Sequence, residues 1–183
     1  MSNSIYAAIH CFKSWGQLAA LLLLIVTNIA SAANDTISTG AQLPNVHMQG
    51  LNGPPQQLSD FRGEPLIINV WASWCRPCRA EMASLERLAW MPNLGSFNVI
   101  GISTDDHSAK ANSWLALSNA TIPHFIDKNL VLEQILGASR IPLTVFVDAE
   151  GRIAKKVYGS RTWDSDESLA LVETFINEIP NID

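Results

Sequence analysis

Two cysteines, Cys75 and Cys78, are separated by two residues in the segment IINVWASWCRPCRAEM, which covers residues 67–82. The pair follows an apolar run that is typical of a buried strand, and it precedes a segment with helical periodicity. Two thiols at this spacing can form a structural disulfide, contribute to a zinc site, or exchange electrons with the disulfide of another molecule. The surrounding residues favour the third of these.

The junction between strand and helix is suited to redox chemistry. Cys75 is expected at the helix N-cap and Cys78 in the first turn, where the helix dipole and free backbone N–H groups stabilise a thiolate on Cys75. Arg76 and Arg79 add positive charge. Pro77 suits a first turn, because its missing N–H would have no partner there. A stabilised thiolate, exposure at a helix tip and a second thiol within reach are what thiol–disulfide exchange requires.

The two alternatives explain less of the pattern. A structural zinc site needs about four ligands, and His47, His107 and His124 stand at no ligand spacing. A purely structural disulfide would close a very short loop, for which the entropic stabilisation is smallest. We therefore interpret the pair as a redox centre and expect no metal and no cofactor. Asp105 and Asp106 are interpreted as a helix cap, because a metal site needs further ligands.

Residues 1–32 are predicted to be a signal peptide. Lys13 precedes an apolar stretch from Leu18 to Val26, and Ala30-Ser31-Ala32 forms a small-residue cleavage site. The stretch is well short of the roughly 20 residues that a membrane-spanning helix needs, so an uncleaved anchor is the second choice. We expect a periplasmic or otherwise exported protein, in a compartment where disulfides persist. It would be held at the inner membrane only if this segment stays uncleaved.

Cleavage would change both the cysteine count and the charge. It would remove Lys13 and Cys11, leaving Cys75 and Cys78 as the only cysteines, with 11 basic and 17 acidic residues and a net charge of −6. An acidic chain without a basic cluster argues against nucleic acid as a partner.

The remaining chain is divided into a linker, residues 33–43, and one domain, residues 44–183. Strand and helix patterns alternate through the domain and end in a hairpin and a helix, which indicates an α/β fold with a mixed sheet. After a short hairpin within 46–58, strands are expected at 66–72, 97–103, 123–126, 144–147 and 152–158. Helices are expected at 76–90, 105–118 and 129–136, with a last one starting at Asp164 in a capping box with Glu167.

Several segments resemble the exported thioredoxin-like proteins of the TlpA/ResA/DsbE type. They are LSDFRGEP, the run PLIINVWAS with Trp74-Cys75-Arg76-Pro77-Cys78 and Glu81, then VIGISTDD and RIPLTVFVDAEGRI. The resemblance covers residues 43–179. It implies a thioredoxin fold, with a mixed central sheet flanked by helices, an N-terminal β-hairpin and a central αβ insertion at about 113–136. It also implies that the protein reduces disulfides of clients such as apocytochrome c, with electrons from a membrane donor of the DsbD/CcdA type.

The resemblance assigns roles to single residues. Cys75 matches the attacking thiolate and Cys78 the resolving thiol of a redox-active disulfide. Pro142, after Ile141, matches the cis-proline that faces this disulfide, whereas Pro123 is interpreted as trans. Glu81 matches the acidic residue near the active site. Residues Trp74, Arg76, Pro77 and Ile141 are expected to surround the site.

One position departs from the wider thioredoxin family. Asn69 stands where thioredoxins have a buried aspartate, although TlpA-like proteins commonly have asparagine there. Because asparagine cannot take a proton, Glu81 is the better candidate for proton transfer near Cys78; the alternative is a solvated glutamate on the helix surface. An oxidase or isomerase of the same fold remains an alternative function, as does a non-catalytic binding module, against which the intact cysteine pair argues.

Overall fold

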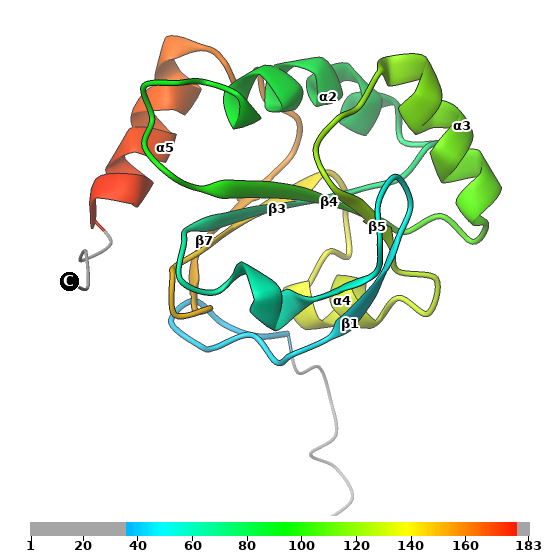
Figure 1. Ribbon diagram of the computed structural model, residues 1–183, viewed down its shortest axis with the longest axis horizontal. Coiled ribbons are helices and arrows are strands. Elements are labelled where there is room, and N and C mark those ends of the chain that lie inside the picture. Colours follow the sequence, from blue (N-terminus) through cyan, green and yellow to red (C-terminus); the bar gives the residue numbers. More distant parts are fainter. Residues whose placement is uncertain (1–35, 179–183) are drawn as a thin grey trace, which may run out of the picture. The chain divides into compact units, whose positions relative to one another are not determined.

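The computed structural model describes residues 36–178, so the predicted signal peptide lies outside the described residues. In this part of the chain, seven strands form one mixed sheet in the order β2-β1-β5-β4-β3-β6-β7. The strands are β1 (His47–Gly50), β2 (Gln56–Gln57), β3 (Leu66–Trp71), β4 (Asn98–Ser103), β5 (His124–Ile126), β6 (Leu143–Val147) and β7 (Ile153–Tyr158). The helices are η1 (Leu58–Phe61), α2 (Arg76–Ala89), α3 (Ser108–Ser118), α4 (Val131–Leu136) and α5 (Asp166–Glu178), as Figure 1 shows.

Strand β3 leads directly into the cysteine pair, and it is buried along its whole length. It pairs in parallel with β4 and antiparallel with β6. Successive residues of a strand face opposite sides of the sheet, and accordingly Ile67 and Ile68 belong to two different core clusters. The nearly unbroken apolar run in the sequence follows from this, because both faces of the strand are covered.

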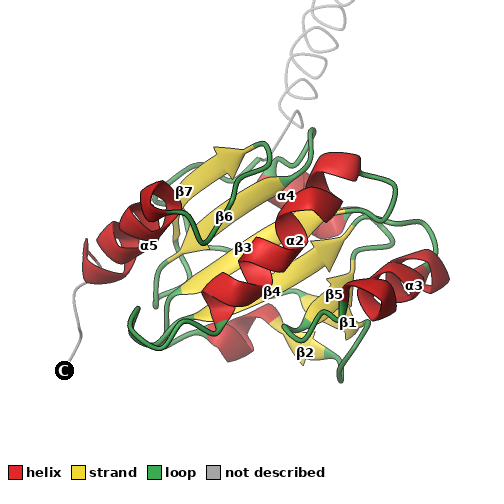
Figure 2. Cartoon of the chain, turned by 90° about the horizontal axis from the view of Figure 1, so that it is seen from above, coloured by secondary structure: helices red, strands yellow, loops and turns green. Residues whose placement is uncertain are grey.

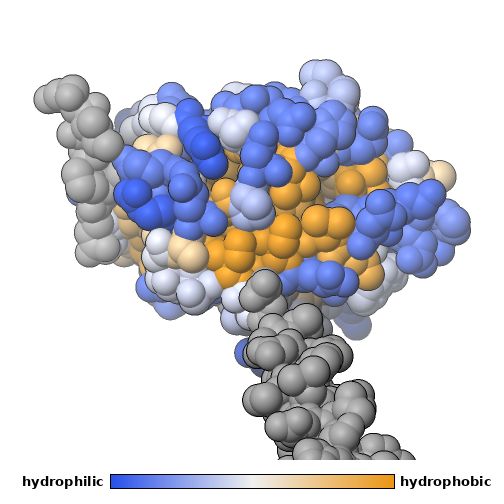
Figure 3. All heavy atoms as spheres, turned by 90° about the horizontal axis from the view of Figure 1, so that it is seen from below, coloured by the Kyte–Doolittle hydropathy of each residue, from blue (hydrophilic) through white to orange (hydrophobic). Residues whose placement is uncertain are grey.

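The helices form two layers around the sheet. Helices α2, α3 and α5 cover one face, and α4 and η1 lie on the other (Figures 1 and 2). Leu85 of α2, Phe146 of β6 and Val172 of α5 share the core cluster on the first face. Leu132 and Leu136 of α4 join the cluster on the second, where Figure 3 shows a band of apolar surface. The resulting layers fix α2, and with it the cysteine pair, across the middle of the sheet.

This architecture is the thioredoxin fold that the resemblance implies, with its mixed sheet flanked by helices. Strands β1 and β2 form the N-terminal hairpin, and β1 also pairs with β5, so the hairpin extends the sheet. The second half of α3, β5 and α4 make up the central insertion. Residues before the hairpin lie alongside the start of β7. Gly40 N–H donates to Ile153 O at 2.7 Å, and Leu43 N–H donates to Gly151 O at 2.8 Å.

The expected cap at the start of α3 is wrong. The helix begins at Ser108 with His107 at the N-cap. The carboxylate of Asp105 instead accepts hydrogen bonds from Ser73 and Ser103. The local sequence would assign this carboxylate to the helix end, but it binds Ser73 of a neighbouring loop instead.

The start of α5 also differs from the expectation. The helix begins at Asp166, and Ser165 Oγ accepts a hydrogen bond from Ser168 N–H at 3.4 Å. Asp164 lies before the helix and pairs with Arg87 of α2 at 2.6 Å. The capping box expected at Asp164 is thus replaced by a serine cap one residue later, because the aspartate is engaged with α2.

Within residues 36–178, no helix has both the length and the apolar character needed to span a bilayer.

Candidate active site

Cys75 and Cys78 form a disulfide at the N-terminus of α2, with their Cα atoms 5.3 Å apart. Cys75 is the N-cap residue, and its Sγ accepts a hydrogen bond from Cys78 N–H at 3.2 Å. The side chain of Cys78 is completely buried, whereas Cys75 keeps 4% of its surface exposed. A sulfur at the N-cap lies where the helix dipole favours negative charge. Of the two sulfurs, that of Cys75 is therefore the one placed to carry a thiolate.

The peptide bond between Ile141 and Pro142 is cis, the geometry expected at this position. The bond before Pro123 is not among the cis bonds. Pro142 directly precedes β6, whose first residue, Leu143, pairs with Val70 of β3. Since β3 and β6 are adjacent, Pro142 lies beside the end of β3, from which the chain continues into the disulfide loop.

Glu81 lies one turn beyond Cys78 on α2 and is only 1% exposed. Its Oε1 accepts a hydrogen bond from Asn69 Nδ2 at 2.8 Å, and its Oε2 accepts from Arg161 N–H at 3.0 Å and Trp163 Nε1 at 3.2 Å. Burial raises the pKa of Glu81, and these hydrogen bonds oppose the rise. The interpretation of Glu81 as a solvated glutamate is wrong, because the β7–α5 loop covers it.

Asn69 connects Glu81 to the sheet. Its Nδ2 donates to Glu81 and also to Thr144 Oγ1 at 3.1 Å, and Thr144 is its neighbour across the β3–β6 pairing. An asparagine cannot exchange a proton here, but as a donor it fixes the orientation of the carboxylate. Asn69 therefore ties Glu81 of α2 to the sheet, although it cannot replace an acid.

Sequence reasoning missed the residues that enclose Glu81. Arg161 and Trp163 lie 80 and 82 residues further along the chain, and no local pattern indicates that their N–H groups reach α2. Trp163 is fully buried in the core beside α2 and α5. The one available signal is that a tryptophan whose side chain is buried usually needs an acceptor for its N–H.

Exposed groups surround the accessible side of the disulfide. Trp74 is 68% exposed, and Arg76 is also exposed. The Arg79 guanidinium lies over the ring of Trp114, 5.0 Å from its centroid, which is an attractive cation–π arrangement. Arg79 is thus held by α3, while Trp74 and Arg76 are available to a docking chain.

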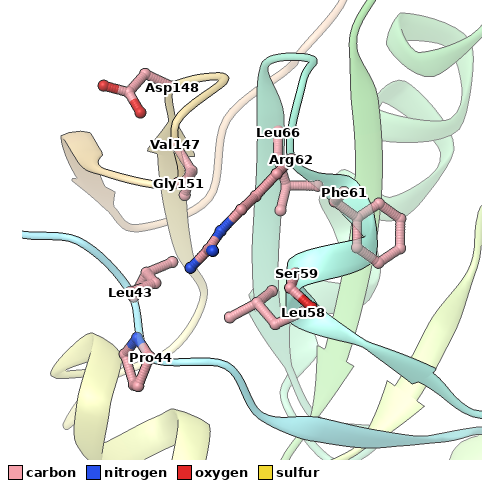
Figure 4. A pocket seen from close by; sticks show the side chains of 10 residues that line it. All are labelled: Leu43, Pro44, Leu58, Ser59, Phe61, Arg62, Leu66, Val147, Asp148 and Gly151. Atoms are coloured by element: carbon pink, nitrogen blue, oxygen red, sulfur yellow. The ribbon is translucent and has the colours of Figure 1, made fainter.

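A small apolar pocket lies far from this site. Leu66 at the start of β3 and Val147 at the end of β6 line it, with Leu43, Leu58 and Phe61, and the side chain of Arg62 enters it (Figure 4). The disulfide follows the opposite end of β3, so the pocket is separate from the redox chemistry. Among residues 36–178, no group of three or more His, Cys, Asp or Glu side chains is placed to hold a metal ion.

Comparison with known proteins agrees with this geometry. Residues 38–171 match the Redoxin family. The chain belongs to that family. It is 34% identical over 142 residues to the thiol:disulfide interchange protein DsbE of Vibrio cholerae, covering 74% of each chain. It is also 24% identical to the thiol-disulfide oxidoreductase ResA of Geobacillus thermodenitrificans, over 79% of this chain and 83% of the relative. Within the Redoxin family, the chain is a thiol-disulfide oxidoreductase of the DsbE/ResA type.

Solved structures show the same fold. A secreted thiol-disulfide isomerase from Corynebacterium glutamicum superposes with a TM-score of 0.64 at 26% identity, over 75% of this chain and 86% of the other. The thioredoxin domain of a thiol-disulfide oxidoreductase from Bacteroides vulgatus gives the same TM-score at 24% identity, over 77% and 99% of the two chains. This Redoxin-family chain therefore keeps the thioredoxin fold at low sequence identity.

Proposed function

We propose that this protein reduces disulfides of exported client proteins, such as apocytochrome c, through the Cys75–Cys78 couple. The observation that carries the proposal is the asymmetry of the pair: Cys75 Sγ accepts a hydrogen bond at the N-cap of α2, whereas Cys78 is fully buried. A nucleophilic thiol must be stabilised as a thiolate and reached by its target. Cys75 is the N-cap residue, and it is the less buried of the two cysteines, with 4% of its surface exposed against none for Cys78.

The reaction begins from the dithiol form. The Cys75 thiolate attacks one sulfur of the client disulfide, and the other client sulfur leaves as a thiolate, giving a mixed disulfide. Cys78 then loses its proton and attacks Cys75 Sγ, which releases the second client thiolate and closes the Cys75–Cys78 disulfide. Two electrons pass to the client. A membrane thiol–disulfide donor of the DsbD/CcdA type supplies two further electrons that reduce the Cys75–Cys78 disulfide, because each turnover leaves the protein oxidised.

Glu81 is proposed to receive the proton of Cys78. The two residues are three positions apart on α2 and therefore lie on the same side of the helix. Burial raises the pKa of Glu81, and a carboxylate with a raised pKa is a better proton acceptor. Because Asn69 cannot titrate, Glu81 is the acid on this side of α2 that can serve the buried thiol.

Pro142 and the exposed residues around Cys75 are proposed to receive the client. Pro142 stands beside the end of β3, and Trp74 offers a large exposed apolar surface next to Cys75. Arg76 and Pro77 form the exposed first turn of α2. An exported location is supported by the signal-peptide pattern of residues 1–32 and by the description of the Corynebacterium glutamicum neighbour as secreted.

Single-cysteine variants test the proposal. Reduced Cys78→Ser, mixed with disulfide-bonded apocytochrome c, is expected to accumulate a mixed disulfide through Cys75, because the resolving thiol is missing. Cys75→Ser should form none, since Cys78 is buried. Peptide mass spectrometry locates the linked cysteine. A mixed disulfide through Cys78 would reverse the assignment, and no complex with apocytochrome c alongside normal reduction of insulin would exclude this client while keeping the chemistry.

A further inference from the structure

The loop that carries Cys75 is tied to a buried carboxylate on the neighbouring strand connection. Ser73 N–H donates to Asp105 Oδ2 at 2.8 Å, and Ser73 Oγ donates to Asp105 Oδ1 at 2.7 Å. Ser103 Oγ donates to Asp105 Oδ2 at 2.8 Å. Asp105 is only 1% exposed and Ser103 is fully buried. All three partners donate, which is the arrangement that an acceptor-only carboxylate requires.

The topology explains how this contact forms. Strands β3 and β4 are parallel and pair in register up to Trp71 and Ser103, so the loops that follow them leave the sheet side by side. Thr104 N–H donates to Trp71 O at 2.9 Å, which continues the pairing to the last residue of β3. Asp105 then reaches across to Ser73, two residues before Cys75. Within the loop itself, Cys75 N–H donates to Ala72 O at 3.1 Å.

We propose that Asp105 is a positioning residue of the redox site: through Ser73 it holds the β3–α2 loop, so that Cys75 Sγ stays at the N-terminus of α2 when the disulfide is open. This inference rests on the proposed function, in which the dithiol form attacks with Cys75. In the disulfide form, Cys78 fixes the sulfur of Cys75 covalently. In the dithiol form that bond is absent, and the hydrogen bonds of the loop are what keep the sulfur over the helix end.

The loss of the Asp105 charge and the release of the loop would shift the pKa of Cys75 in opposite directions, which makes the proposal testable. A nearby negative charge disfavours a thiolate, so removing the charge of Asp105 would by itself lower the pKa of Cys75. Releasing the loop would move the sulfur away from the helix N-terminus and raise the pKa. Asp105→Asn removes the charge and also replaces one acceptor by a donor that faces Ser73 or Ser103. The sign of the change therefore separates the two effects.

The experiment is the pH profile of iodoacetamide alkylation of the reduced full-length protein, with the modified cysteine located by peptide mass spectrometry. For Asp105→Asn we expect the pKa of Cys75 to rise by about one unit, so that alkylation well below the pKa slows about tenfold. The matched control is Asp106→Asn, which removes the same charge at an exposed neighbouring position. It should leave the profile unchanged or shift it slightly downward.

Ser73→Ala supplies a second variant that does not disturb the carboxylate. It deletes the hydroxyl donor and keeps the backbone N–H bond, so the pKa of Cys75 should rise by less than in Asp105→Asn. The double variant should resemble Asp105→Asn, because both changes act on one contact. If Asp105→Asn fails to fold, the pKa of Cys75 in Ser73→Ala alone tests the proposal. An unchanged or lowered pKa of Cys75 in the folded variants overturns the proposal.

Wild-type protein in the same experiment tests the proposed function separately. Alkylation of Cys78 before Cys75 would overturn both the order of attack and the positioning role. Preferential alkylation of Cys75 in the wild type, together with an unchanged profile in the variants, would overturn only the role of Asp105.

Discussion

Lowering the pH from 8 to 5 is expected to cost the folded protein about 2 kcal/mol of stability through His124 alone. His124 opens β5 and is 1% exposed, with its ring edge-on to Trp71 at a centroid distance of 5.4 Å. A Cβ at Gly101 on the neighbouring strand would overlap this ring. The ring therefore fits here because residue 101 has no side chain. Neither ring nitrogen has a hydrogen-bond partner among the described residues.

The sign and size follow from the burial of a neutral ring. Burial lowers the pKa of His124 from 6.5 to about 3, so the unfolded chain binds a proton at a pH where the folded chain does not. Stability is therefore complete above about pH 6.5 and declines as the pH falls toward 3. One unit of pKa difference corresponds to about 1.4 kcal/mol, so the full loss is about 5 kcal/mol below pH 3, of which about 2 kcal/mol is reached at pH 5.

Urea unfolding of the oxidised protein at pH 8 and pH 5 measures this loss. His124→Phe keeps an aromatic ring against Trp71 but cannot titrate, and His124→Leu serves if the larger ring strains the contact with Gly101. Every other titrating group is shared with the wild type and cancels in the comparison. The variant should lose about 2 kcal/mol less than the wild type between the two pH values. Equal losses would refute the burial of His124 as a neutral group.

Three further predictions concern the redox site. Glu81→Gln should keep the fold but lower the pKa of the Cys78 thiol in the reduced protein, because a nearby carboxylate disfavours a second negative charge; an unchanged NMR titration of the thiols would assign Glu81 a structural role only. Cys75→Ser should abolish the reduction of insulin, and retained activity would show that Cys78 can attack directly. If the Cys75–Cys78 couple is reducing, the disulfide form is the more stable form of the folded protein. The urea midpoint of unfolding should therefore fall in excess reductant. A midpoint that rises would identify the protein as an oxidant.

Local sequence was sufficient to predict the centre of the site. The positions of Cys75 and Cys78 at the start of a helix follow from an apolar run, a proline at the first turn and the helical spacing after it, all within about 20 residues. Such signals depend on neighbours along the chain, which the sequence displays directly. The cis bond before Pro142 could be expected only from the family resemblance, because sequence alone does not separate it from Pro123.

Local patterns in the sequence predict an α/β fold with a mixed sheet, the order of its elements and the redox chemistry of the cysteine pair, and the family resemblance adds the thioredoxin fold. The roles of the acidic residues depend on tertiary packing. Glu81 is buried because the β7–α5 loop closes over it with donors from Arg161 and Trp163, and Asp105 leaves the helix end because parallel strands bring Ser73 to it. A carboxylate is stabilised wherever suitable donors converge. Those donors come from segments distant in sequence, so their convergence is set by packing rather than by any local pattern.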